Sequence, residues 1–244
     1  MQKYFITKEE FDSLIISGPE YHHITRVMRM KTDDTFVINY DYTDKLVKIK
    51  SIDSSKVYLS LLKTLNGNSE LPFFVSLFQC YPKSDKLDII IKNSVQLGVS
   101  AIYPVLSSRT QVKINQEKIS KKTLRFNKIS KESAEQSKRM FIPTVYEPVK
   151  LSKIDFSSYD HVIICYEESA KQGENSAFKQ ITKNIKNDDK IAVVVGPEGG
   201  LSEDEVLDLE SRGGIRCGLG PRILRTEQAI TYALSCFSYE KELK

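Results

Sequence analysis

The sequence is poor in the residues that build metal centres, disulfide frameworks and membrane spans. Its 244 residues include 4 cysteines and 3 histidines, and these form neither a CxxC pair nor a Cys/His cluster at metal-ligand spacing. The N-terminal stretch is charged from Lys3 onward, and apolar runs of about 18 residues are missing. We therefore expect reduced thiols, no metal ion, no membrane span and a cytoplasmic location.

Signatures of phosphate-binding loops are missing too. The segment VGPEGG at 195–200 has neither the Lys-Ser/Thr ending of a P-loop nor the GxGxxG of a dinucleotide fingerprint. ATP and NAD are therefore poor candidates for the ligand of this loop. The chain also has no internal repeat and no low-complexity tract.

What the chain has is the composition of a folded globular protein, with a hydrophobic fraction of 40% and a charged fraction of 28%. Its net charge is only +4, but the stretch from Lys113 to Arg139 holds nine basic residues against three acidic ones. One region therefore carries the positive field. On a helix its basic face either contacts phosphate or is simply solvated, and charge alone favours neither. The members of that face are Lys118, Lys121, Lys122 and Arg125.

The first part of the chain predicts a small β-barrel or sandwich, which we place at residues 1–70. A short helix is expected to begin at Pro19, and its apolar positions are Tyr21, Ile24, Val27 and Met28. Strand signals follow at 35–40, 45–52 and 56–62. The polar Gly/Asn/Ser/Pro segment 65–72 then predicts a domain boundary.

Residues 71–244 predict an α/β domain, because short apolar strands alternate with helical segments. Such alternation favours a parallel sheet covered on both faces. The strands are expected at 73–81, 99–106, 161–166, 191–195 and 215–219. The helices are expected around 87–97, ending at Gly98, and at 116–138, 175–186 and 202–212.

Two glycine-rich segments follow strands of this sheet, and ligands of open α/β sheets bind at such strand ends. The first, VVVGPEGG, runs into a capping box at Ser202 and Glu205; a tight strand-to-helix turn is its plainest interpretation. The second is GLGPRILRTEQA at 218–229, with Thr226 expected as an N-cap. A cap does not explain Arg222 and Arg225, which together predict a corner that binds an anion or a carbonyl oxygen.

These segments resemble the RsmE family, the 16S ribosomal RNA uridine-N3 methyltransferases of the SPOUT superfamily. The resemblance covers nearly the whole chain. It rests on VGPEGGLSEDE at 195–205 and LGPRILRTEQA at 219–229, and further matching residues are Lys92 to Val99, Pro104, Arg109, Glu132 to Ser137, Arg139, Pro143, and His22-His23 followed by Arg26 to Arg29. Four places depart from the family's usual residues: Met1 to Lys3, Asp33, Gln96 and Gln228, the last of which lies nearest the predicted site.

The resemblance implies a PUA-like RNA-binding β-barrel at 1–70 and a SPOUT-type methyltransferase domain at 71–244, with a parallel sheet and a trefoil knot. It also implies S-adenosyl-L-methionine as cofactor, a homodimer, and 16S ribosomal RNA or the small ribosomal subunit as substrate. The expected cofactor-binding residues are Tyr166, Glu167, Gly196, Glu198, Gly199, Gly200, Leu219, Gly220, Ile223, Leu224, Thr226 and Ala229. The expected RNA contacts are Arg26, Arg29, Arg109, Lys138, Arg139 and Arg222.

Arg225 is the predicted catalytic residue. Uracil N3 carries a proton at neutral pH, so its methylation needs negative charge on the base to be stabilised, and a guanidinium does this for the uracil oxygens. The apolar positions of the last helix, Ala229, Ala233, Leu234 and Phe237, serve either a dimer interface or the core. Two other functions stay open: an RNA-binding or ribosome-assembly protein without catalysis, and a methyltransferase acting on transfer RNA or on a ribose 2′-hydroxyl.

Overall fold

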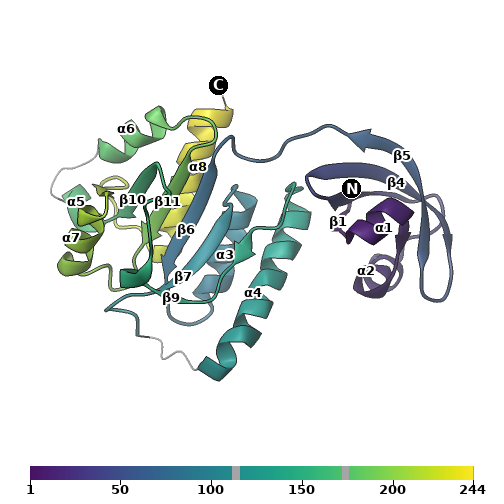
Figure 1. The fold of residues 1–244 in the computed structure, drawn as a ribbon, viewed down its shortest axis with the longest axis horizontal. Coiled ribbons are helices and arrows are strands. Elements are labelled where there is room, and N and C mark those ends of the chain that lie inside the picture. The colour runs from purple at the N-terminus through teal and green to yellow at the C-terminus, as the bar shows by residue number, and fades with distance from the viewer. Residues whose placement is uncertain (112–115, 172–175, 244) are drawn as a thin grey trace. The chain divides into compact units, whose positions relative to one another are not determined.

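The computed structural model describes residues 1–111, 116–171 and 176–243 (Figure 1). The chain forms two compact units, one of residues 1–70 with 134–142 and one of residues 71–133 with 143–244. The sequence assigns 134–142 to the second domain, whereas in the structure this segment packs within the first unit. The prediction that Lys113 belongs to the basic stretch lies outside the described residues.

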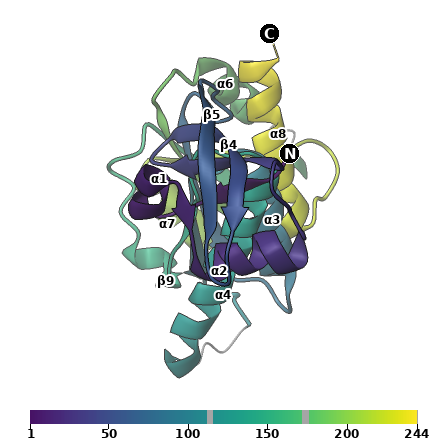
Figure 2. The same cartoon turned by 90° about the vertical axis from the view of Figure 1, so that its right-hand side faces the viewer.

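The first unit is built on a β-sheet whose strands run β1-β3-β4-β5-β2. The strands are β1 (Lys3–Phe5), β2 (Ile15–Ile16), β3 (Thr35–Tyr40), β4 (Thr43–Ile52) and β5 (Val57–Leu65). β1 pairs with β3 in parallel, and the other neighbouring strands are antiparallel. β4 and β5 lie side by side over most of their length (Figure 2). Val47 and Ile49 are fully buried between more exposed lysines, as the alternation in the sequence predicts.

The short helix α2 (Gly18–His22) begins with Pro19 in its first turn, as predicted, and continues as a π-helical turn at His23–Val27. The backbone N–H of Met28 donates to the carbonyl oxygen of His23, five residues back. The wider turn changes which side chains share a face. Tyr21 and Ile24 are buried, but Val27 is 65% exposed and Met28 38% exposed, so the four apolar positions do not form one buried face.

The second unit is built on a sheet in the order β12-β10-β11-β6-β7-β8, with β9 also paired to β7. Its strands pair in parallel throughout the described residues, which confirms the predicted α/β class. The strands are β6 (Phe74–Cys80), β7 (Ala101–Leu106), β8 (Thr144–Val145), β9 (Val149–Lys150), β10 (His161–Cys165), β11 (Lys190–Val195) and β12 (Gly214–Cys217).

Except for the short α5, which the sequence does not predict, the helices of this unit fall close to the predicted ranges. They are α3 (Lys86–Gln96), α4 (Gln116–Gln136), α5 (Glu167–Lys171), α6 (Ala177–Asn184), α7 (Glu203–Ser211) and α8 (Thr226–Glu242), with a 3₁₀ turn at Leu151–Lys153. Gly98 follows α3 with a φ of +97°, and a Cβ there would lie 2.7 Å from the Leu71 side chain. Glycine is therefore required at this helix end for both reasons.

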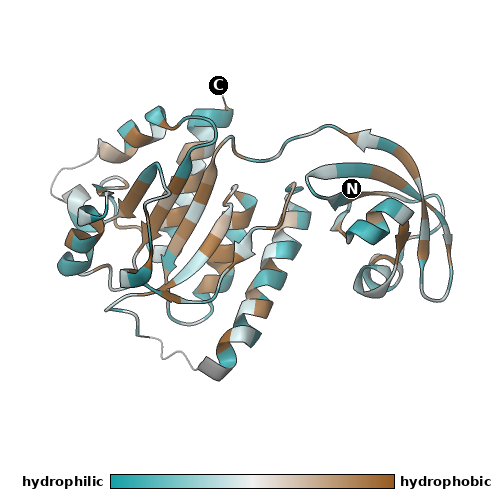
Figure 3. Cartoon of the chain, viewed as in Figure 1, coloured by the Kyte–Doolittle hydropathy of each residue, from teal (hydrophilic) through white to brown (hydrophobic). Residues whose placement is uncertain are grey.

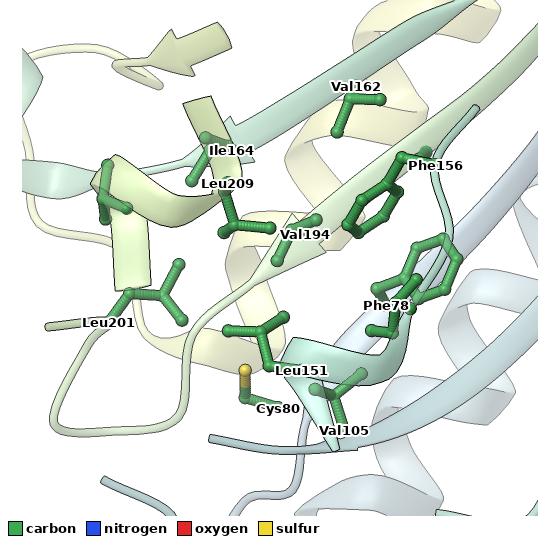
Figure 4. Packing of buried hydrophobic residues seen from close by; sticks show 13 residues of the cluster. Phe78, Cys80, Val105, Leu151, Phe156, Val162, Ile164, Val194, Leu201 and Leu209 are labelled. Atoms are coloured by element: carbon green, nitrogen blue, oxygen red, sulfur yellow. The ribbon is translucent and has the colours of Figure 1, made fainter. Parts of the chain in front are cut away.

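Both faces of the parallel sheet are covered, and its strands are among the most hydrophobic parts of the chain (Figure 3). On one face, Phe78, Ile164 and Val194 pack against the segment around Leu151 to Phe156 and against Leu209 of α7 (Figure 4). The alternate residues of the same strands point to the other face, where α8 contacts α3 and β11.

The apolar face of α8 belongs to this core. Ala233, Leu234 and Phe237 are completely buried, and Ala229 is 7% exposed. Of the two interpretations that the sequence leaves open for these residues, ordinary core is the right one. These four side chains are therefore not available for a dimer interface.

Candidate active site

Several strands of the parallel sheet end in one row. The register pairs Cys165 at the end of β10 with Val195 of β11 and with Cys217 of β12, and Val195 with Gln79 of β6. The loops that leave these ends enclose a cleft of about 530 Å³. The carboxyl ends of parallel strands are where such sheets bind ligands, so this cleft is the candidate active site.

The first glycine-rich loop, 196–201, is tightly folded. A Cβ on Gly196 would lie 3.0 Å from the backbone of Gly200 and Leu201, and Gly200 has a φ of +69°. Leu201 is buried in the core beside Leu209 (Figure 4). Arg109 donates hydrogen bonds to the carbonyl oxygens of Gly199 and Leu201, at 2.8 and 3.2 Å. The conformation of the loop is therefore held by two contacts: Leu201 is buried in the core, and Arg109 bonds two of the loop's carbonyl oxygens.

The second glycine-rich segment leads from β12 into α8. Gly220 has a φ of +100°, which favours glycine. The N-cap of α8 is Arg225, and its carbonyl oxygen accepts hydrogen bonds from the backbone N–H groups of Gln228 and Ala229. Thr226 is thus the first helical residue, and the prediction that it caps the helix is wrong. Its hydroxyl donates instead to the carbonyl oxygen of Gly196, at 2.7 Å.

Lys86, the first residue of α3, joins the two glycine-rich segments through its ammonium group. It lies 3.0 Å from a carboxylate oxygen of Glu198 and 3.6 Å from one of Glu227. Glu198 also accepts hydrogen bonds from the backbone N–H of Lys83. Burial raises the pKa of the Glu198 carboxyl, but hydrogen bonds from its own backbone and from Lys86 outweigh this, so the net pKa is lowered.

A second polar network includes Tyr166 and Glu203, two further residues that line the cleft. The hydroxyl of Tyr166, which follows β10, donates to Glu203 at 2.9 Å. Arg216 of β12 donates to Glu203 and, through two bonds of 2.8 Å, to Glu210. The nearby Cys165 is no candidate nucleophile, because burial raises the pKa of its thiol to about 12. The side chains of Tyr166 and Glu203 are therefore held in place by hydrogen bonds and by the ion pair with Arg216.

Arg222 and Arg225 give the cleft a basic lip. Both side chains are exposed, both residues line the cleft, and neither guanidinium has a hydrogen-bond or ion-pair partner among the described residues. Each therefore keeps its donors for a ligand. A guanidinium with free donors next to a glycine-rich loop is suited to bind an anion or a carbonyl oxygen.

All twelve residues that the sequence predicts as cofactor contacts line this one cleft, together with Arg109, Arg222 and Arg225. Gln228, where the chain departs from the RsmE pattern, is exposed and does not line it. The remaining predicted RNA contacts, Arg26, Arg29, Lys138 and Arg139, lie in the first unit.

Arg139 does not fit its predicted role as an RNA contact. Its side chain is 2% exposed and paired with Glu70, to which Nε donates at 2.7 and 2.9 Å and Nη2 lies at 2.5 Å. Glu70 also accepts a hydrogen bond from the backbone N–H of Met140. This pair holds the 134–142 segment within the first unit. Arg26, Arg29 and Lys138 are exposed.

Sequence reasoning missed two groups at the site. Gln79, at the end of β6, is completely buried, and its amide donates to Thr226 Oγ1 at 2.8 Å. Lys86 is the other. Gln79 stands in a run of apolar residues, where a polar side chain that is to be buried needs partners, and that is the signal that points to it. Nothing in the sequence around Lys86 distinguishes it from other surface lysines.

Within 1–111, 116–171 and 176–243, no group of three or more His, Cys, Asp or Glu side chains has the arrangement of a metal site. Over the same residues, no helix is both long enough and apolar enough to span a membrane.

Comparison with known proteins agrees with this two-part organisation. Residues 69–238 match the family model of an RNA methyltransferase domain, and residues 16–62 match that of an RNA methyltransferase PUA domain. The ribosomal RNA small subunit methyltransferase E of Bacillus subtilis is 41% identical over 251 residues, which cover 100% of this chain and 98% of that protein.

Solved structures show the same fold. A crystal structure of a hypothetical protein is 37% identical and superposes with a TM-score of 0.90 over 99% of both chains. A Legionella pneumophila protein, solved with the cofactor SAM bound, is 26% identical, with a TM-score of 0.84 over 98% of this chain and 97% of that one. The predicted PUA-like and parallel-sheet domains are thereby confirmed, while the trefoil knot stays a prediction. With a relative of this similarity along its whole length and both family models matched, the chain belongs to the ribosomal RNA small subunit methyltransferase E family.

Proposed function

We propose that this chain transfers a methyl group from S-adenosyl-L-methionine to N3 of a uridine in 16S ribosomal RNA. The observation that carries the proposal is the cleft itself: two glycine-rich loops meet at the strand ends, and two unpaired arginines stand at its lip. Family membership supports methyl transfer to ribosomal RNA. The choice of uridine N3 rests on the resemblance to the RsmE family together with the position of Arg225.

The residues of the cleft fit S-adenosyl-L-methionine. Pockets for ligands of this size usually have ~300–1,000 Å³, and the cleft has about 530 Å³. Four of its lining residues are glycines of the two loops, Gly196, Gly199, Gly200 and Gly220, and glycine allows a ligand to approach the backbone closely. The SAM-bound Legionella relative supports the assignment. We assign the cofactor to Tyr166, Glu167, Gly196, Glu198, Gly199, Gly200, Leu219, Gly220, Ile223, Leu224, Thr226 and Ala229.

When bound, the cofactor supplies a methyl group on a positively charged sulfur. The chain's part is to hold the uracil in line with that methyl group and to lower the cost of losing the N3 proton. Negative charge then grows on the two oxygens that flank N3. Arg225, whose guanidinium has no partner among the described residues, donates hydrogen bonds to these oxygens and stabilises the charge.

The RNA strand is proposed to contact exposed cations on both units. Arg222 lies three residues before Arg225 in the same glycine-rich segment and suits a phosphate next to the target base. Arg26, Arg29 and Lys138 are the proposed contacts of the first unit. Arg109 uses part of its guanidinium to brace the first loop, so we expect its contribution to RNA binding to be the smallest of the set.

A homodimer is also part of the proposal. Beside the cleft, α6 and α8 border an apolar groove of about 550 Å³, which shares Leu219 and Gly220 with the cleft. Its lining includes Phe178, Tyr232 and Tyr239, and the last is 70% exposed. Exposed aromatic side chains beside a groove are typical of an interaction site; Tyr232 is 40% exposed, and Tyr232 and Tyr239 are the proposed contacts of a second copy. Sedimentation equilibrium tests this directly.

Replacement of Arg225 by alanine separates catalysis from binding. Arg225→Ala is expected to keep the dissociation constant for S-adenosyl-L-methionine, measured by calorimetry, within about twofold. Methyl transfer should fall roughly 10²–10³-fold, the usual cost of removing one donor to a developing oxyanion. Arg222→Ala is the matched control, because it removes the other unpaired arginine of the loop. It should weaken RNA binding and leave the rate at saturating RNA nearly unchanged.

Two results would overturn the proposal. Wild-type protein that gives no heat with S-adenosyl-L-methionine would be an RNA-binding protein without catalysis. Methylation found on a ribose or on another base position would leave the methyltransferase activity standing but refute the choice of uridine N3.

A further inference from the structure

Three groups from three different elements meet beneath the floor of the cleft. Gln79 comes from the end of β6, Gly196 follows β11, and Thr226 begins α8. Gln79 Nε2 donates to Thr226 Oγ1 at 2.8 Å, and Thr226 Oγ1 donates to the Gly196 carbonyl oxygen at 2.7 Å. The Gln79 side chain is 0% exposed and Thr226 is 7% exposed. This chain of bonds joins the two glycine-rich segments directly.

The direction of each bond is fixed by chemistry. A carbonyl oxygen only accepts, so the single hydroxyl hydrogen of Thr226 has to point at Gly196. Gln79 then has to present its NH₂ group to Thr226, and the same group reaches the carbonyl oxygen of Cys80 at 3.0 Å and, at the longer distance of 3.5 Å, that of Gly196. The amide oxygen of Gln79 is left buried and without a partner among the described residues.

The hydroxyl of Thr226 is consequently committed within the protein. Its hydrogen is used on Gly196 and it already accepts one hydrogen bond from Gln79, although the residue lines the cleft. It also caps nothing, because Arg225 is the N-cap of α8. The hydroxyl therefore affects ligand binding indirectly, because it fixes the position of Gly196. Gly196 is packed closely against the backbone of Gly200 and Leu201, where a Cβ atom would lie only 3.0 Å away.

We propose that Gln79 and Thr226 are positioning residues that set the separation of the two glycine-rich segments and thereby the affinity for the cofactor. The inference rests on the proposed function, in which this cleft holds S-adenosyl-L-methionine. Without the bond between Thr226 and Gly196, the distance between the two glycine-rich segments varies, and only part of the molecules have the distance that the ligand requires. The apparent dissociation constant then rises by the inverse of the fraction of molecules that are competent to bind.

The test compares two threonines that differ only in place. Thr182 of α6 is 5% exposed, and its hydroxyl donates to a carbonyl oxygen of its own helix, Phe178, at 2.8 Å. Thr226→Val and Thr182→Val thus remove the same group from equally buried sites. Calorimetry with S-adenosyl-L-methionine on the full chain should give a dissociation constant roughly tenfold higher for Thr226→Val, and one within about twofold of wild type for Thr182→Val.

Two further measurements separate positioning from folding. Thr226→Ser keeps the hydroxyl and is expected to restore most of the affinity. Amide hydrogen exchange at Gly200, whose N–H donates to the Pro197 carbonyl oxygen at 2.9 Å, should quicken in Thr226→Val and stay unchanged in Thr182→Val. If Thr226→Val does not fold, Gln79→Met removes the hydrogen bonds that Gln79 donates to Thr226 and to the Gly196 carbonyl oxygen, and it is expected to raise the dissociation constant in the same direction.

A Thr226→Val protein that binds the cofactor as tightly as wild type would overturn the inference, as would an equal loss of affinity in Thr182→Val. Failure of the wild-type protein to bind S-adenosyl-L-methionine refutes the proposed function instead, so the two failures are distinguishable.

Discussion

Glu198 lies in the glycine-rich loop that follows β11, and it accepts hydrogen bonds from the Lys83 backbone while its carboxylate pairs with Lys86. The net pKa of this carboxyl lies below its ordinary value of 4.5. A carboxyl with a lower pKa in the folded chain stabilises the fold fully above its unfolded value. That contribution is lost as the pH falls through the folded pKa.

Glu198→Gln should therefore change how stability depends on pH. The difference in unfolding free energy between wild type and Glu198→Gln is expected to be constant near neutral pH and to shrink below about pH 4.5. Urea unfolding at a series of pH values measures it. Glu242→Gln, a like change at an exposed residue of α8, is the control. A difference that instead grew as the pH fell would contradict the assigned hydrogen bonds.

The residues of the site divide by the kind of signal they carry. Glycines and arginines at strand ends are visible in the sequence, because both glycine-rich segments follow directly on apolar runs that predict strands. The sequence predicts the wrong role for Thr226, because the N-cap and the first helical residue are adjacent positions. Only the structure shows that the Thr226 hydroxyl donates to Gly196 and does not cap the helix. Lys86 could not be found, since its two partners come from segments far away in the chain.

At the scale of single elements, α7 shows how the end of the first loop is fixed. Ser202 accepts a hydrogen bond from the backbone N–H of Glu205, and Glu205 accepts one from the backbone N–H of Ser202 in return, as the predicted capping box requires. The other carboxylate oxygen of Glu205 accepts a hydrogen bond from the Ser108 backbone at 2.6 Å. The capping residue Glu205 thus also connects the start of α7 to the segment that carries Arg109.

Ser202→Ala is expected to lower the stability of the second unit by about 1 kcal/mol, the typical value of one capping side chain. Thermal unfolding measures this. Ser17→Ala removes the N-cap serine of α2, which makes no side-chain capping bond, and should change stability by no more than a few tenths of that amount. Equal effects of the two substitutions would mean that the capping bond at Ser202 contributes nothing.

Elements with a regular period were predictable, and those with a broken period were not. The buried strands and α3 follow directly from apolar runs and helical spacing. The turn at His23–Val27 has the sequence of an ordinary helix, and only its i→i+5 bond turns Val27 and Met28 outward. The very short strands β1 and β2 offer too few residues for any period to be read.

At the scale of the whole molecule, the division into units departs from the order of the sequence. Residues 134–142 belong to the first unit although they follow α4. Two buried pairs fix them there: Arg139 with Glu70, and Lys3, which bonds Asp44 and the carbonyl oxygen of Lys138. Arg139, at the end of the basic stretch, therefore stabilises the first unit and does not face solvent. A count of charges in the sequence cannot show which of them are buried.

Arg139→Met should destabilise the first unit by roughly 3 kcal/mol or more, because it leaves the Glu70 carboxylate buried without its charge partner. Lys138→Met, at the exposed neighbour, should change stability by less than about 0.5 kcal/mol. Chemical denaturation followed by tyrosine fluorescence measures both. If Arg139 were an RNA contact, its loss would weaken RNA binding and leave stability untouched, which is the opposite result.

The central claim is that the cleft at the strand ends methylates uridine N3 in small-subunit ribosomal RNA with Arg225 as its catalytic residue. Its most direct test is the level of N3-methyluridine in that RNA from a strain that lacks the gene, complemented with wild type or with Arg225→Ala. We predict that the modification disappears in the deletion strain, returns with wild type and does not return with Arg225→Ala. An unchanged level in the deletion strain, or full restoration by Arg225→Ala, would contradict the account.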